Sequence, residues 1–176
     1  MAGLIARVRP LIATRQHRLF TPEPVADEIL HALTEVARWT GSSRNTQPWR
    51  FLVVRDVALI RELGEKGHPQ TRSLHTAMAA IAIVMPDEES RATSLAYDEG
   101  RAAERMLIAA SILGIGAGIA WVTSLKRAEF AQLLGVAPGT FVRTIIAVGH
   151  PSEEGRARRS APGTARLPRE QVVFER

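Results

Sequence analysis

Short apolar runs, none approaching the ~20 residues of a membrane span, constrain the fold of this 176-residue chain most strongly. Each run has the length of a buried strand and lies between amphipathic segments or Gly and Pro punctuation. Such runs occur at Phe51–Val54, Ala79–Met85, Ile119–Val122 and Val142–Val148. Their alternation with helical segments predicts an α+β fold, with a central mixed β-sheet of four or five strands flanked by helices. Because 45% of the residues are hydrophobic, the chain can bury the core of one domain, and we expect a single domain over 1–176.

Helical periodicity and capping signals mark the intervening segments. We expect helices over Leu4–Ala13, Val25–Trp39, Asp56–Glu65, Leu95–Leu113 and Leu125–Leu134. The longest has a seam of small residues that suits close packing against another helix. That seam consists of Ala102, Ala103, Met106, Ala109, Ala110 and Leu113. Near the end of the chain, Glu170–Phe174 is predicted to form an edge strand.

Composition and motif order exclude several functional classes. The chain has no cysteine, which removes disulfide scaffolds, zinc ribbons, iron–sulfur clusters and thiol nucleophiles. The histidines show no metal-ligand spacing, and neither a P-loop nor a serine in a strand-to-helix turn is present, so we predict no metal and no hydrolase chemistry. Gly114, Gly116 and Gly118 lie between a helix and a strand, the reverse of the order in a dinucleotide fingerprint. Because charge and Pro10 interrupt the first residues, no signal peptide is expected and we predict a cytoplasmic protein.

The charge balance is basic, with 23 Lys and Arg against 18 Asp and Glu and a formal net charge of +5. Only Lys66 and Lys126 are lysines, so an anion site here is built from guanidinium groups. The densest cluster lies in the tail and comprises Arg156, Arg158, Arg159, Arg166 and Arg169. Few aromatic residues accompany this cluster, and a nucleic-acid-binding protein is therefore the least favoured interpretation.

Two polar segments are harder to explain by packing. In Arg15-Gln16-His17-Arg18, two guanidinium groups three residues apart can converge on one phosphate, although a solvated charged corner would have the same sequence. In Gly41–Trp49, hydroxyl and amide groups stand between a helix and a strand and can frame a flat polar heterocycle. A turn whose Ser and Asn side chains bond their own backbone is the alternative, but it does not explain Gln-Pro-Trp at the start of a strand.

Together the two segments resemble motifs of the nitroreductase family of flavin mononucleotide (FMN) oxidoreductases. The family pattern Arg-Arg-Ser-x-Arg-x-Phe stands here as residues 14–20, followed by Pro24-Val25. The pattern Ala-Pro-Ser-Ser-x-Asn-x-Gln-Pro-Trp stands as residues 40–49. Asp98-x-Gly100, the end of the Ala-rich helix at 113–116, residues 148–151 and Arg166-Leu167-Pro168 follow in the family order, so the resemblance spans nearly the whole chain.

The resemblance implies an intertwined homodimer with two FMN sites at its interface and a tail, from about 150 to 176, that extends onto the partner subunit. The phosphate would be held by Arg15, Gln16, Arg18 and Arg166. The partner subunit would supply Ser42, Ser43, Asn45 and Gln47 to the ring. Ala120, Trp121 and Val122 would lie beside the ring, with backbone amides near flavin N5. The flavin itself would carry a hydride from NADH or NADPH to an electron-poor acceptor such as a nitroaromatic or a quinone.

The chain also departs from the family pattern, and other functions stay open. Thr14 replaces the first arginine, Gln16 the serine and Gly41 the loop proline, while Trp121 would wall the substrate pocket. One alternative is a specialised relative that fragments flavin or dehalogenates aromatics. Another is a flavin-binding sensor in which Trp121 blocks the hydride donor.

Overall fold

Four strands form one sheet in the order β1-β2-β4-β3. The computed structural model describes residues 2–157 and 166–176. The strands are β1 (Arg50–Val54), β2 (Ala79–Pro86), β3 (Gly116–Trp121) and β4 (Thr140–Gly149). In this part of the chain all three neighbouring pairs are antiparallel, so the expected mixture of parallel and antiparallel pairs is wrong. The reason is that β4 inserts between β2 and β3, which run parallel to each other without touching.

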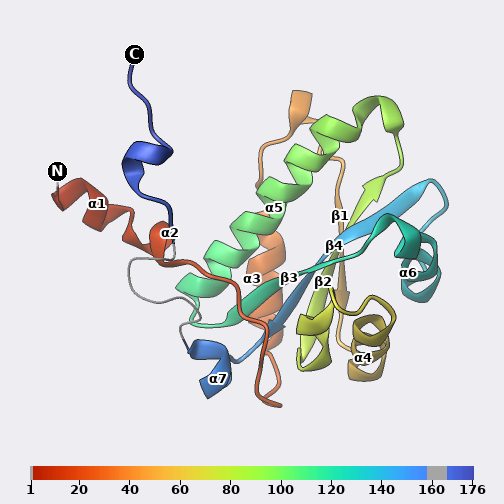
Figure 1. The fold of residues 1–176 in the computed structure, drawn as a ribbon. Coiled ribbons are helices and arrows are strands. Elements are labelled where there is room, and N and C mark those ends of the chain that lie inside the picture. The colour runs from red at the N-terminus through yellow and green to blue at the C-terminus, as the bar shows by residue number, and fades with distance from the viewer. Residues whose placement is uncertain (1, 158–165) are drawn as a thin grey trace.

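Helices cover both faces of this sheet, as the α+β prediction required (Figure 1). Helices α3 (Asp27–Arg38) and α5 (Ala92–Ile112) pack on one face, and α4 (Val57–Lys66) and α6 (Arg127–Leu134) on the other. Each face has its own apolar cluster, one including Leu33 and Met106 and the other including Ile60 and Phe130. Burial of these two clusters is the main favourable contribution to folding.

Sequence signals located most of the element boundaries. The Asp56 carboxylate accepts hydrogen bonds from the N–H groups of Ala58 and Leu59 at the start of α4, and Gly135 ends α6 with a left-handed φ of 61°. The small-residue seam of α5 is buried as predicted except for Leu113, which lies just beyond the helix and is 48% exposed. Strand β1 is less buried than expected, because it is an edge strand and only Val54 is fully covered.

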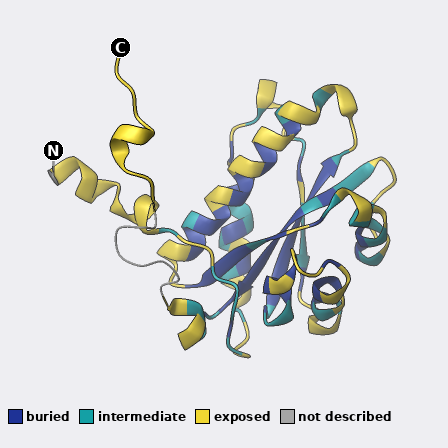
Figure 2. Cartoon of the chain, in the orientation of Figure 1, coloured by how far each residue is buried: buried dark blue, intermediate teal, exposed yellow. Residues whose placement is uncertain are grey.

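The two ends of the chain project from the body on the same side, and both are exposed (Figures 1 and 2). The N-terminal segment forms α1 (Ala2–Arg7) and α2 (Arg9–Ala13). The predicted strand over Glu170–Phe174 is wrong: the structure has a short 3₁₀ turn, Arg169–Gln171, and an exposed end. The remaining helix is α7 (Glu153–Arg156), and further 3₁₀ turns are Ser43–Asn45, Arg72–His75, Glu89–Arg91 and Ser124–Lys126. None of the described helices combines the length and the apolar character needed to cross a membrane.

Candidate flavin site

The arginine segment, residues 14–20, is attached to the outer edge of β3. The His17 N–H donates to the Ala117 carbonyl at 2.8 Å, and the Gln16 side-chain oxygen accepts from the Ile119 N–H at 3.0 Å. This approach depends on Gly118, because a Cβ at that position would lie 2.1 Å from the His17 carbonyl oxygen. Since β3 has no neighbouring strand on this side, the segment takes the hydrogen-bonding positions of a further strand.

Side chains of this segment have different neighbours. The Arg15 guanidinium donates to the Arg156 carbonyl at the end of α7, and His17 Nδ1 lies 3.1 Å from the Gly155 carbonyl oxygen. Burial lowers the pKa of His17; the bond to Gly155 partly opposes this, and the charges of Arg15 and Arg156 add to it. Arg15 is therefore directed at α7, whereas Arg18 lines a pocket elsewhere.

That pocket has a volume of about 300 Å³ and is lined by Arg18, Leu19, Arg72 and His75. Arg72 and His75 lie on the 3₁₀ turn that contacts β3. The His75 Nε2 atom is buried and has no hydrogen-bond partner in the described part of the chain; Glu65 Oε1 is 3.7 Å away. Sequence reasoning missed Arg72 and His75, because neither belongs to a motif and only the fold brings them to Arg18. Two guanidinium groups and an imidazole give this pocket an anion-binding character.

The four backbone amides at residues 119–122 all have partners. Ile119 donates to Gln16, Trp121 to the Gln70 carbonyl at 3.3 Å, and Val122 to the Arg143 carbonyl at 2.8 Å, while Ala120 lies in the pairing with β4. The side chains of Ala120 and Val122 are fully buried, so these two residues can offer only their backbone.

Only Trp121 exposes its side chain on this stretch, at 47%. The Arg143 guanidinium lies 5.9 Å from its ring, within cation–π range. Glu99, which is 1% exposed, accepts from Arg143 through Oε2 and fixes the guanidinium. Neither Glu99 nor Arg143 stood out in the sequence, since single charged residues within helices and strands are common.

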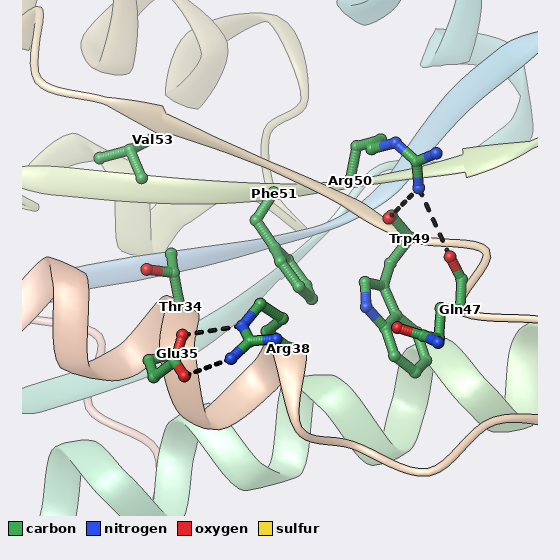
Figure 3. Close-up of a pocket in the computed structure, with 8 residues that line it drawn as sticks. All are labelled: Thr34, Glu35, Arg38, Gln47, Trp49, Arg50, Phe51 and Val53. Atoms are coloured by element: carbon green, nitrogen blue, oxygen red, sulfur yellow. Dashed lines mark hydrogen bonds and ion pairs between the residues drawn. The ribbon is translucent and has the colours of Figure 1, made fainter. Parts of the chain in front are cut away.

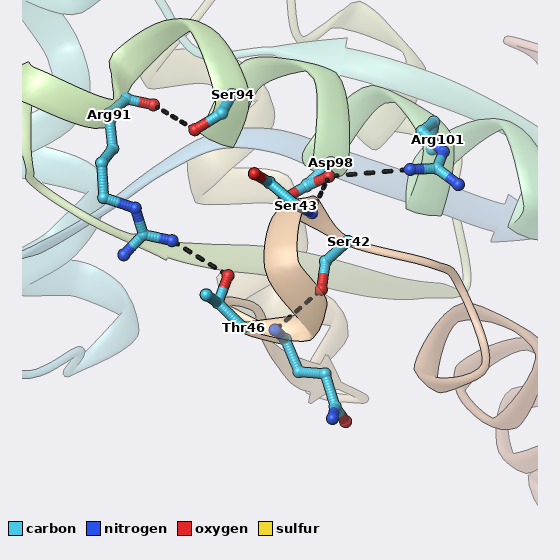
Figure 4. A network of polar contacts seen from close by, with 8 residues as sticks. Ser42, Ser43, Thr46, Arg91, Ser94, Asp98 and Arg101 are labelled. Atoms are coloured by element: carbon cyan, nitrogen blue, oxygen red, sulfur yellow. Dashed lines mark hydrogen bonds and ion pairs between the residues drawn. The ribbon is translucent and has the colours of Figure 1, made fainter.

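The polar loop, residues 40–48, is folded against the first half of α5 (Figure 4). The Ser43 N–H donates to both carboxylate oxygens of Asp98, at 3.1 and 3.0 Å. The Ser42 hydroxyl accepts from the Gln47 N–H at 2.9 Å, as expected for a turn that satisfies its own backbone. Ser43, Asn45 and Gln47 remain exposed.

The polar loop and the arginine segment lie at opposite ends of α5 (Figure 1). The loop contacts Asp98, whereas the arginine segment lies beside the strand that follows Ile112. At a rise of 1.5 Å per residue the helix separates these points by roughly 20 Å. Within one chain the structure therefore does not bring the two candidate groups together.

A second pocket, of about 400 Å³, opens between α3 and the outer edge of β1 (Figure 3). Gln47 lies at its rim, and Trp49 and Phe51 form part of its wall. Opposite them, Glu35 accepts from Arg38 and from the Trp39 indole, and these bonds lower the pKa of Glu35 to about 2. The remaining lining residues are Thr34, Arg50 and Val53.

The basic tail can be placed only in part. Arg156 ends α7 and Arg166 is exposed at the start of the C-terminal segment, whereas Arg158 and Arg159 lie outside the described residues.

A profile of the nitroreductase family matches residues 12–84, which include the arginine segment and the polar loop. A protein of Archaeoglobus fulgidus, named both NADH dehydrogenase and NAD(P)H nitroreductase, is 28% identical over 84% of this chain and 86% of its own length. An NADPH-flavin oxidoreductase of Vibrio harveyi is 25% identical over 96% of this chain and 72% of its own.

The fold agrees with these sequence matches. A solved structure from Desulfovibrio desulfuricans, described as a nitroreductase in complex with FMN, superposes with a TM-score of 0.76 at 26% identity, covering 96% of this chain and 95% of that one. Family motifs, relatives that align over most of the chain and a shared fold agree: the chain is similar to the nitroreductase family, whose profile matches residues 12–84.

Proposed function

We propose that this protein transfers a hydride from NADH or NADPH, through a bound FMN, to a small electron-poor acceptor such as a nitroaromatic or a quinone. Its similarity to NAD(P)H nitroreductases, to an NADPH-flavin oxidoreductase and to a nitroreductase solved with FMN supports an NAD(P)H-dependent flavin oxidoreductase that uses FMN. The observation that carries the proposal is the arginine segment attached to β3, with Arg18 in a pocket beside Arg72 and His75.

The donor set of the described residues fits FMN. Arg18 and Arg72 offer guanidinium forks to a dianionic phosphate or to the polar edge of a flavin ring. Arg15, directed at the end of α7, and Arg166 in the tail would add to the positive field. A flavin atom at the Ile119 N–H requires Gln16 to turn away, because that N–H now donates to Gln16.

The ring side of the site is proposed to come from a second subunit. The polar loop contacts the first half of α5 and is too distant from the arginine segment of its own chain to share a flavin with it (Figure 1). The loop residues concerned are Ser42, Ser43, Asn45 and Gln47. A homodimer would place this loop beside the partner's arginine segment. The proposal is supported by exposed apolar side chains on both terminal segments, which monomeric proteins rarely leave uncovered. They include Leu4, Ile5, Leu11, Ile12, Leu167, Val172 and Phe174.

FMN, when bound, supplies the hydride chemistry, and the chain holds and orients it. Ala120 in β3 and Val122 just after it are buried, and Trp121 would form a wall on the open side. The Arg143 guanidinium, bound to Glu99, restricts the indole of Trp121 and so limits which acceptors can approach.

Flavin retention in arginine variants tests the cofactor assignment. Arg18→Ala and Arg166→Ala should each raise the dissociation constant of FMN by about ten- to a hundredfold, because each removes a charge-assisted contact worth roughly 1.5–3 kcal/mol. Arg55→Ala is the matched control, since Arg55 pairs with exposed Asp27 on the surface. Full flavin content in both Arg18→Ala and Arg166→Ala would show that the phosphate lies elsewhere.

Light scattering tests the dimer, and turnover tests the enzyme. We expect a dimer that loses FMN affinity when residues 167–176 are deleted; a monomer that retains full flavin would contradict the shared site. NADH and NADPH oxidation with a quinone acceptor should depend on added FMN. A protein that holds FMN without oxidising either donor would be a flavin-binding protein in which Trp121 excludes the donor.

A further inference from the structure

Asp98 has no part in the hydride transfer proposed above, yet it is one of the two acidic residues that the fold buries almost completely. Its exposure is 2%, and both carboxylate oxygens accept from the Ser43 N–H. The Arg101 Nη1 atom lies 3.8 Å from Asp98 Oδ1 (Figure 4). Burial of a carboxylate is unfavourable unless donors compensate it, and the backbone of the polar loop provides the donor here.

The segment that Asp98 holds, residues 42–47, has an unfavourable backbone. Arg44, Asn45 and Gln47 have φ values of 52°, 55° and 46°, in the left-handed region that side chains with a Cβ disfavour. Such a conformation persists where surrounding contacts fix it. Other contacts that do so include the Gln47 N–H donating to the Ser42 hydroxyl, and the Arg91 guanidinium donating to the Thr46 hydroxyl at 2.9 Å. Backbone hydrogen bonds within residues 42–46 add to them.

Gly41, which stands where the family pattern has a proline, lies beside the contact between Asp98 and the loop. A Cβ at Gly41 would lie 2.9 Å from the Arg101 Nη2 atom, so the glycine leaves room for the guanidinium beside the loop. From there Arg101 faces Asp98 one helical turn away. The loop, the carboxylate and the guanidinium therefore pack as one unit on α5.

We propose that Asp98 is a positioning residue for the flavin: by binding the Ser43 N–H it keeps residues 42–47 in the conformation, left-handed at three positions, that presents Ser42, Asn45 and Gln47 to the ring. This rests on the proposed function for the flavin itself. The proposal has two parts: that Asp98 fixes the loop, which follows from the geometry alone, and that the fixed loop positions the flavin. The two parts can be tested separately.

Glu99 provides a matched control one residue away. It is also on α5 and 1% exposed, but its carboxylate pairs with Arg143 on β4 and not with the loop. Asp98→Asn and Glu99→Gln each remove one buried negative charge with little change in shape. Only the first weakens the bond to Ser43.

Trypsin reports directly on the loop, because Arg44 is exposed within it. In the full-length protein, with and without FMN, the rate of cleavage after Arg44 is followed by mass spectrometry, and FMN affinity by fluorescence titration. We expect Asp98→Asn to raise both the cleavage rate and the FMN dissociation constant on the order of tenfold, the effect of weakening one charged hydrogen bond. Glu99→Gln should leave cleavage after Arg44 unchanged. Gly41→Ala, which displaces Arg101, is a second variant for the case that Asp98→Asn does not fold, and should change both quantities in the same direction.

The outcomes separate the two parts of the proposal. Cleavage and affinity both at the wild-type level in folded Asp98→Asn would overturn it. Faster cleavage with unchanged FMN affinity would show that Asp98 holds the loop without positioning the flavin, which also overturns it. A wild-type protein that binds no FMN would remove the proposed function, and with it the flavin role of Asp98, while the cleavage rates would still decide whether the carboxylate holds the loop.

Discussion

Replacing Gly118 by alanine should loosen the arginine segment. The added Cβ would lie 2.1 Å from the His17 carbonyl oxygen, where an ordinary contact needs 3.4 Å or more, so the segment must move outward by roughly 1 Å. The hydrogen bonds on either side, from His17 to Ala117 and from Ile119 to Gln16, measure 2.8 and 3.0 Å. An outward movement of this size stretches both bonds beyond hydrogen-bond length.

The expected cost follows from these contacts. Each lost hydrogen bond contributes about 1 kcal/mol, and overpacking costs typically 1–3 kcal/mol. Alanine has less backbone entropy than glycine in the unfolded state, and this difference raises the free energy of unfolding by about 0.5–1 kcal/mol. The free energy of unfolding should therefore fall by about 2–4 kcal/mol, which for a chain of this size lowers Tm by roughly 5–15 °C. FMN affinity should fall as well, because Gln16 and Arg18 move with the segment.

Thermal unfolding of the apoprotein and FMN titration measure these two effects. Gly100→Ala serves as the control, since Gly100 lies within α5 and an added Cβ would meet nothing within 4 Å. The free energy of unfolding of that variant should rise by about 0.5–1 kcal/mol. A Gly118→Ala protein with the Tm and FMN affinity of the wild type would refute the reasoning, because it would show that the segment is not held against β3.

Three further predictions concern stability. Burial lowers the pKa of His17 below the ordinary 6.5, so as pH falls through 6.5 the unfolded state binds a proton at His17 before the folded state does. Part of the stability measured at pH 7.5 should therefore be lost by pH 5.5. His17→Gln should reduce that loss in thermal melts. Asp56→Ala removes the acceptor for two N–H groups of α4 and should cost about 1 kcal/mol in urea unfolding, whereas Asp56→Asn should cost much less. Met106 is fully buried, so Met106→Ala opens a cavity beside α5 and should cost about 2–5 kcal/mol by the same assay.

Local patterns predicted the elements well where one physical signal dominated. The buried run Ala79–Met85 is recognisable because a central strand is apolar on both faces, and Asp56 because a cap satisfies backbone donors in its own vicinity. The prediction of a strand over Glu170–Phe174 was wrong, because a strand-like sequence pattern shows only that a segment is suited to a strand. Pairing needs a neighbour, and none of the described strands lies beside it.

The candidate site residues were likewise predicted where a local sequence pattern identified them, and missed where only the fold brings them together. Motifs located the arginine segment and the polar loop, since each is contiguous in sequence. Arg72 and His75 act through neighbours that are distant in sequence, and no local pattern distinguishes them from ordinary surface residues. Asp98 stood in a motif, but the sequence did not show that its carboxylate binds the polar loop. Convergence of Arg15 and Arg18 was expected from their spacing, but spacing does not reveal that α7 offers Arg15 a carbonyl partner.

The three departures from the family pattern have structural counterparts in this chain. The Thr14 hydroxyl donates to the Pro10 carbonyl at 2.9 Å and satisfies an acceptor at the end of α2, where an arginine could not make the same short contact. Gln16 has the reach to bond the Ile119 N–H, which a serine lacks, and so helps to attach the segment to β3. Gly41 leaves space for Arg101 beside Asp98. The replacements at 14 and 16 thus exchange groups that the resemblance assigns to the phosphate for local contacts, and the Gln16 bond attaches the arginine segment to β3. The positive charge expected at the phosphate then rests on the remaining arginines, so loss of either Arg18 or Arg166 should reduce FMN binding.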